Sequence, residues 1–241
     1  MKKLISVALV VAMLLSMSVT ASAAENSDTS FLPAVQVSEV DGIRTATYSD
    51  DKTTYIVTYD MLNNTVRVAQ KDIESGVITY GSTESTLMND SGVDVASSTI
   101  HQDTFCNFEY DIYVGNPNEW NLERPDDNDG SGQLYFMVYE NSSNEEELDT
   151  WFDAVNALND KEWEAVSDCG LAIVSAAAAG FVSGMAVASG GILTAGAIST
   201  IVAAAGATGA AATTIAQIGT CCNVCRLAYN DVYIATDNMH F

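Results

Sequence analysis

Charged side chains are missing from 57 consecutive residues of this chain, those from 169 to 225 between Asp168 and Arg226. This charge-free segment contains 17 Ala and 9 Gly. Of the 32 carboxylates in the chain, 30 lie between Glu25 and Asp168, so the acidic and the uncharged parts of the sequence are segregated. A long uncharged segment beside an acidic region is either membrane-active or a well-shielded helical core, and most of the functional question depends on which it is.

Histidine is scarce, and the familiar catalytic motifs are absent from the sequence. The two histidines, His101 and His240, lie near no recognisable nucleophile or metal-ligand pattern. The sequence contains no G-x-S-x-G, H-E-x-x-H or P-loop motif. The carboxylates are too numerous for one pair to stand out as an acid and a base. We therefore expect a protein that is not an enzyme and has no catalytic residues.

Basic residues are also few, and two of the nine are Lys2 and Lys3 at the start of the chain. They precede an apolar stretch from Leu4 to Met17 and the small-residue site Ala21-Ser22-Ala23, so residues 1–23 are predicted to be a signal peptide. Its removal leaves seven basic and 32 acidic side chains, a net charge of −25. This charge disfavours nucleic acid and anionic lipid as partners and allows a cation or a basic partner. We expect a secreted protein, with association with the cell envelope as the alternative.

Residues 25–140 predict an acidic, β-rich domain. The segment Thr53–Tyr59 alternates, a turn at Asn63-Asn64 follows, and Thr65–Ala69 returns as a second strand. The other strand candidates are Ile43–Ser49, Val77–Gly81, Phe105–Val114 and Gln133–Glu140. Residues 82–98 are polar and show little periodicity, which predicts a long loop. The pattern favours an antiparallel sheet with one face in water.

A helical region is predicted from residue 144 to 230, and its first helix covers Glu145–Asn159. Ser143 and Glu146 have the spacing of a capping box at the start of this helix. Apolar side chains then recur at helical spacing, which is typical of a helix packed on a core. They are Leu148, Trp151, Phe152, Val155 and Leu158.

The charge-free segment, 169–225, breaks most clearly at Ser189-Gly190-Gly191, which predicts helical arms over 162–188 and 192–229, a bend near 206–209 and a tail over 231–241. Each arm would be long enough to cross a bilayer. Gly180 and Gly184 have the spacing that lets two helices approach closely. Ala is only weakly hydrophobic, so a hairpin buried against Glu145–Asn159 is the favoured interpretation and permanent membrane residence is the alternative. The predicted fold class is α+β, with an antiparallel sheet domain, an amphipathic helix and an Ala/Gly-rich hairpin.

Cys169 opens the charge-free segment and Cys221, Cys222 and Cys225 close it. An antiparallel hairpin brings its two ends together, which predicts a disulfide between Cys169 and one of the other three. It would close a loop of about 50 residues and contribute on the order of 4 kcal/mol. The spacing Cys222-x-x-Cys225 also occurs in redox-active sites, but no thioredoxin-like βαβ pattern surrounds it, and no second ligand pair for zinc is present.

One segment matches the opening of a calcium-binding loop. Asp127, Asp129 and Ser131 occupy its first three ligand positions, and Gly132 follows. The twelfth position, which should hold a bidentate Glu, is Val138. These residues are therefore a weak candidate for a calcium site. An acidic turn that contains glycine would account for the same residues.

The layout resembles that of the geobacillin-26-like proteins, large secreted bacteriocins of Gram-positive bacteria. The similar stretches are residues 59–65, 115–120, 139–144 and 152–156, the last leading into Glu162-Trp163 and the charge-free segment. The resemblance implies an antibacterial protein that acts on the envelope or a receptor of a competing bacterium, and it carries over no catalytic residues. We expect the hairpin to be the effector; the alternative is a non-enzymatic surface or interaction protein whose hairpin is structural or an anchor.

Overall fold

The computed structural model of the chain describes residues 34–84, 99–126 and 133–237. The predicted signal peptide, most of the predicted loop and the calcium candidates Asp127, Asp129 and Ser131 lie outside these residues. Within them, nine strands in two antiparallel sheets are followed by four α-helices. The predicted α+β class is confirmed.

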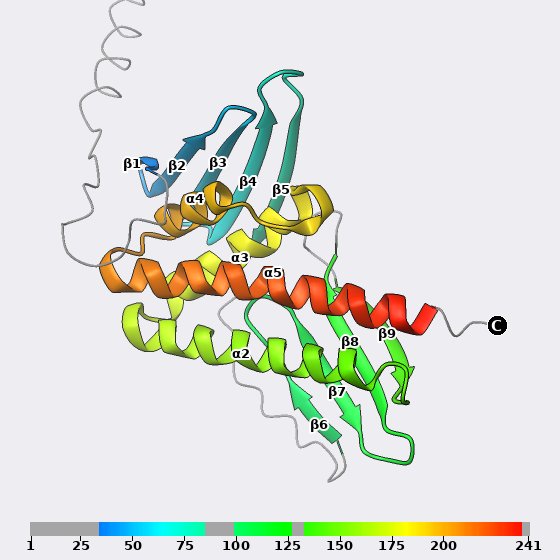
Figure 1. Cartoon of the computed structure of the whole chain (residues 1–241). Helices are drawn as coiled ribbons and strands as arrows, with labels where there is room; N and C mark the ends of the chain where they lie inside the picture. The colour runs from blue at the N-terminus through cyan, green and yellow to red at the C-terminus, as the bar shows by residue number, and fades with distance from the viewer. Residues whose placement is uncertain (1–33, 85–98, 127–132, 238–241) are drawn as a thin grey trace, which may run out of the picture.

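The first sheet, sheet A, has five strands joined in chain order by hairpins (Figure 1). The strands are β1 (Gln36–Val40), β2 (Ile43–Ser49), β3 (Thr53–Asp60), β4 (Thr65–Asp72) and β5 (Ile78–Glu84). Asp41 and Gly42 join β1 to β2 with positive φ angles of 52° and 78°, as a two-residue hairpin turn requires. Alternate residues such as Tyr55 and Val57 are buried on one face, so the sheet has one covered and one wetted side.

The second sheet, sheet B, has four strands, also in chain order. They are β6 (Thr99–Gln102), β7 (Glu109–Tyr113), β8 (Glu119–Pro125) and β9 (Gln133–Tyr139). Strands β1, β6 and β8 were not predicted. β1 and β6 are short edge strands with little buried surface, whereas β8 does alternate, burying Trp120 and Leu122 between polar residues.

The helices lie against one face of each sheet (Figure 1). They are α2 (Glu145–Cys169), α3 (Leu171–Val187), the short 3-10 helix η1 (Ser189–Gly191), α4 (Ala195–Ala205) and α5 (Gly209–Asp237). α3 crosses β4 and β5, and α4 crosses β2 and β3, so both cover sheet A. α2 and α5 lie side by side, antiparallel, and pack on sheet B.

The two layers are packed by different kinds of side chain. Sheet B meets its helices through aromatic rings, such as Phe108 against Trp151 and Phe136 against Tyr229. Sheet A meets its helices through small residues: a Cβ atom placed on Gly81 would lie 2.7 Å from the Ser183 carbonyl oxygen. The Ala/Gly-rich composition of the charge-free segment therefore lets backbone approach backbone over sheet A.

Several predicted helix boundaries are wrong. The first helix is capped at Asn144, so the Ser143–Glu146 capping box does not form. The Asn144 side chain turns back instead, accepting a hydrogen bond from the Asn141 N–H (2.8 Å) and donating one to the Tyr139 carbonyl (3.1 Å). This contact ties the start of α2 to the end of β9.

The two long arms predicted over 162–188 and 192–229 are also wrong. Gly170, with a φ of 88°, separates α2 from α3, and Gly206, with a φ of 87°, ends α4 at the predicted bend. These left-handed conformations favour glycine and stop each helix. Within the charge-free segment, α3 and α4 pack mainly on sheet A rather than on the helix predicted over Glu145–Asn159. The last part of the segment belongs to α5, which runs along α2. α5 continues to Asp237, so most of the predicted tail is helical.

Replacing Gly180 with Val should lower the free energy of unfolding by about 1–3 kcal/mol. A Cβ atom at Gly180 would lie 2.6 Å from Ile201 Cγ2 of α4, so the two helices must separate to accept it. Ala172→Val, on the exposed side of the same helix, is the matched control and should cost only the weaker helix propensity of Val, about 0.5 kcal/mol. Chemical denaturation measures both; equal losses would show that α3 and α4 are not in close contact.

Candidate functional site

The segment Leu171–Ala205, comprising α3, η1 and α4, is the candidate functional site, and we call it the helix pair. It contains no charged residue, and every residue from Val174 to Met185 is buried. The predicted helix-packing residues Gly180 and Gly184 lie at the contact between its two helices, facing Ile201 and Leu193. No helix among the described residues is both long enough and apolar enough to cross a membrane.

Two polar side chains of α5 hold the turn of the helix pair. Asn223 makes two hydrogen bonds to the backbone of Leu193: its Oδ1 accepts from the N–H (2.8 Å), and its Nδ2 donates to the carbonyl (2.9 Å). Arg226, which is largely buried, lies over the neighbouring Gly191, where a Cβ atom would be 2.8 Å from the guanidinium carbon. We call Asn223 and Arg226 the latch, because they join α5 to the helix pair at the end farthest from its chain connections.

Glycines with left-handed backbones connect the helix pair to the rest of the chain. Gly170 precedes α3, and Gly206 and Gly209 follow α4, with φ angles of 88°, 87° and 60°. A Cβ atom at Gly170 or Gly209 would meet no neighbour within 4 Å, whereas the Arg44 guanidinium packs against Gly206. A few dihedral changes at such positions can reorient a whole element, as in hinge motions.

Packing beneath the helix pair is incomplete. The hydroxyl groups of Ser175 and Ser183 on α3 are buried and have no hydrogen-bond partner within the described part of the chain. A buried hydroxyl without a partner costs about 1–3 kcal/mol. A cavity of about 200 Å³ lies between sheet A and the turn of the pair, lined in part by Tyr55, Gln70 and Val187. The contact between the helix pair and sheet A is therefore buried but contains a cavity and two hydroxyl groups that are unpartnered among the described residues.

A buried carboxylate that was not predicted from the sequence lies where α2 meets sheet B and α5. Glu162 is fully buried, and its two oxygens accept hydrogen bonds from the backbone N–H groups of Phe105 (2.8 Å) and Cys106 (3.0 Å). Burial raises the pKa of Glu162 to about 7, against the lowering effect of these hydrogen bonds. Its sequence signal is its spacing, since it continues the apolar stripe four residues after Leu158 and three before Ala165.

Glu162 should make the stability of the protein depend on pH. The folded protein keeps this proton up to about pH 7, whereas an ordinary Glu loses it near 4.5, so the folded state binds more protons in between. The free energy of unfolding should therefore fall as pH rises through this window, by about 3 kcal/mol. Glu162→Gln cannot titrate and should lack this fall, and Asp153→Asn, on the exposed side of α2, should keep it. Denaturation at several pH values measures the slopes; parallel slopes for wild type and Glu162→Gln would contradict the assignment.

The predicted disulfide from Cys169 does not form in the structure, where all five cysteines are free. Asp168 accepts a hydrogen bond from the Thr214 hydroxyl (3.1 Å), which places Cys169 beside the start of α5. Cys221 lies seven residues farther along α5, about 10 Å at 1.5 Å per residue. That separation is too large, because the Cα atoms of a disulfide lie within about 7 Å of each other. The expected pairing fails because α5 begins inside the charge-free segment, so Cys169 lies beside Thr214 and not beside the cysteines of α5.

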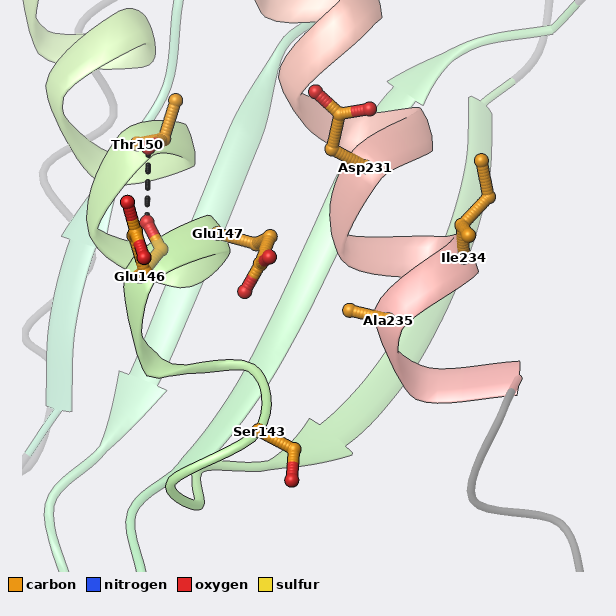
Figure 2. Close-up of a pocket in the computed structure, with 7 residues that line it drawn as sticks. All are labelled: Ser143, Glu146, Glu147, Thr150, Asp231, Ile234 and Ala235. Atoms are coloured by element: carbon orange, nitrogen blue, oxygen red, sulfur yellow. Dashed lines mark hydrogen bonds between the residues drawn. The ribbon is translucent and has the colours of Figure 1, made fainter.

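An acidic groove lies between the start of α2 and the end of α5 (Figure 2). It has a volume of about 640 Å³. Its lining residues are Ser143, Glu146, Glu147, Thr150, Asp231, Ile234 and Ala235. The only polar contact drawn among them is the Thr150 hydroxyl donating to the Glu146 carbonyl (2.9 Å), a bond within the helix. Among these lining residues, no hydroxyl group is hydrogen-bonded to a carboxylate.

The wetted side of sheet B, which we call the acidic face, combines carboxylates with exposed aromatic side chains. The outward residues of β7, β8 and β9 are Glu109, Asp111, Tyr113, Glu119, Asn121, Glu123, Tyr135, Met137 and Tyr139. Glu109 and Glu123 lie directly opposite each other in the register. Burial, and then the charges of Glu123 and Asp103, raise the pKa of Glu109, so like charges are crowded here. His101 extends the face and pairs with Asp111 at 2.8 Å.

Among the described residues, no group of three or more His, Cys, Asp or Glu side chains is placed to hold a metal ion.

The comparisons with family models, with curated proteins and with solved structures found no match. Function is therefore inferred from the residues of this chain.

Proposed function

We propose that the chain is a secreted, bacteriocin-like antibacterial protein whose helix pair acts on the membrane of a competing cell. The observation that supports this proposal best is the helix pair itself: an uncharged, Ala/Gly-rich element, buried over sheet A, connected by glycines and held by a polar latch. The resemblance of the sequence to the geobacillin-26-like proteins supports the same function. The acidic remainder of the chain would keep the buried form in solution.

The electrostatics require a change of state before the helix pair can reach a membrane. The region around it is strongly acidic and is repelled by anionic bacterial lipids, so the helix pair must separate from sheet A or the charge must be neutralised. Helices rich in Ala and Gly gain little from lipid beyond what close packing with each other provides, which keeps the buried and the exposed states close in energy. Breaking the latch should therefore shift the balance toward the exposed state.

The test uses the full chain without residues 1–23 and the latch variant Asn223→Ala. Removing the amide leaves the N–H and carbonyl of Leu193 without their partner, which should cost about 1–3 kcal/mol. We expect weak leakage of anionic vesicles from wild type at neutral pH, more at low pH, and about tenfold more from Asn223→Ala at neutral pH. Killing of indicator bacteria on a lawn should change in the same order.

Thr220→Ala, on the exposed side of α5, is the matched control and should behave as wild type, since its hydroxyl bonds only within the helix. Tryptophan fluorescence shows whether the rest of the protein stays folded, because Trp120, Trp151 and Trp163 all belong to β8 and α2. If Asn223→Ala keeps native fluorescence, loses stability and still leaks no more than wild type, the helix pair is structural and the proposal fails.

A second candidate function is favoured by the acidic face. Its crowded carboxylates beside exposed Tyr135 and Tyr139 suit a basic partner with apolar groups, such as a cationic protein or envelope component. The chain would then be a non-enzymatic interaction protein, secreted or held at the cell envelope, with a structural helix pair.

Tyr135→Ala/Tyr139→Ala should separate the two candidates. Both rings are more than half exposed, so the double variant should fold as wild type, and Thr45→Ala on the outer side of sheet A is its control. If the acidic face is the binding surface, retention of the double variant on intact indicator cells should drop about tenfold while leakage of protein-free vesicles stays unchanged. Unchanged retention would rule out these tyrosines as the contact.

A further inference from the structure

Cys106 is held in a fixed position between sheet B and the helices. It lies in the connection between β6 and β7 and is fully buried. Its backbone N–H donates to Glu162 Oε1 (3.0 Å), and the N–H of the preceding Phe105 donates to Glu162 Oε2 (2.8 Å). These two hydrogen bonds hold the β6–β7 connection against α2, which places the Cys106 side chain beside Glu162.

The register of α2 and α5 brings Cys222 to the same place. The hydrogen bond between Asp168 and Thr214 sets an antiparallel pairing, in which Glu162, six residues back along α2, faces the part of α5 that holds Cys221 and Cys222. Cys222 is fully buried in the shared core. The Cys222 thiol and the Glu162 carboxyl group lie close enough to the Cys106 thiol that both raise its pKa, after burial. Three elements that are distant in the sequence thus meet at one pair of thiols.

We propose that Cys106 and Cys222 form a disulfide in the exported protein, joining sheet B to α5. The two thiols are oxidised to one S–S bond, and a disulfide of a thiol–disulfide oxidoreductase, or a small-molecule disulfide, is reduced to two thiols. Each hydrogen lost from Cys106 and Cys222 ends on one sulfur of that oxidant. Formation of the bond requires the adjacent sulfur atoms to close to about 2.0 Å.

The remaining cysteines are placed less well for this bond. Cys169 lies beside Thr214, about two helical turns from Cys222. Cys225 lies one turn beyond Cys222 along α5 and is not among the groups that raise the pKa of Cys106. Cys221 is only partly buried and lies near Lys161. The disulfide would leave these three thiols free.

The bond should form while the chain folds rather than afterwards. Burial raises the pKa of the Cys106 thiol well above its ordinary value, and the thiolate is the form that attacks a disulfide. Before α5 docks on α2 this thiol is in water and reactive. The test therefore starts from the unfolded chain.

The full chain without residues 1–23 is unfolded, reduced, and refolded in a mixture of reduced and oxidised glutathione, and its free thiols are then counted under denaturing conditions. Three of the five cysteines should remain free in wild type. Cys106→Ala and Cys222→Ala should each leave four free thiols, whereas Cys169→Ala, Cys221→Ala and Cys225→Ala should each leave two. Cys106→Ser and Cys222→Ser provide the same count if an Ala variant does not fold.

Thermal unfolding gives an independent measurement. A reductant should lower the melting temperature of oxidised wild type and of Cys169→Ala by about 5–15 °C, and should not change that of Cys106→Ala/Cys222→Ala. Five free thiols in refolded wild type, or loss of the bond in Cys169→Ala rather than in Cys222→Ala, would overturn the proposal. Neither readout depends on the proposed antibacterial function, so the two can fail separately.

Discussion

The antiparallel contact between α2 and α5 is the interaction on which the other contacts of the helices depend. α2 presents the buried stripe that includes Leu148, Trp151 and Glu162, and α5 covers it along most of its length. On its other sides α5 meets Phe136 of sheet B through Tyr229 and holds the turn of the helix pair through Asn223. Without this contact, Phe136 of sheet B would lose its partner on α5 and the helix pair would lose its latch.

The two sheets of the molecule solve the same problem with different side chains. Each antiparallel sheet must cover one apolar face. Sheet B does so with large rings, which fill the space between strand and helix and fix the contact geometry. Sheet A does so with Ala, Gly and Ser, which bury less apolar area for each residue. Two buried hydroxyl groups in this layer have no hydrogen-bond partner among the described residues, and a cavity remains beside it. The aromatic layer is therefore packed through large rings, and the small-residue layer through close approach of helix and strand backbones.

Polar groups decide how the layers are joined. Glu162 pairs with two backbone N–H groups of the β6–β7 connection, and Asn223 pairs with the N–H and carbonyl of Leu193. Each of these side chains satisfies backbone groups that no helix or strand partner reaches, as buried polar groups require. Both are specific contacts in otherwise apolar surroundings, so each fixes one relative placement of the elements it joins.

The sequence by itself determined the α+β class, most of the strands, the start of the first long helix at Glu145 and the glycine break near residue 206. These follow from local properties: side-chain alternation, apolar spacing and the conformational freedom of glycine. The close approach that Gly180 and Gly184 allow was also predictable, because it depends only on the absence of a side chain.

The tertiary structure alone decided which sheet each helix covers and which cysteines meet. Cys169 and the cluster on α5 were expected to pair because a simple hairpin joins its ends, but α5 starts within the charge-free segment and pairs with α2, which places Cys106 beside Cys222 instead. Glu162 and Asn223 show the same limit. Their positions follow helical periodicity, but their partners lie 56 and 30 residues away in the chain. Only packing of the whole molecule brings such groups together, since no local pattern in a sequence encodes the register between distant elements.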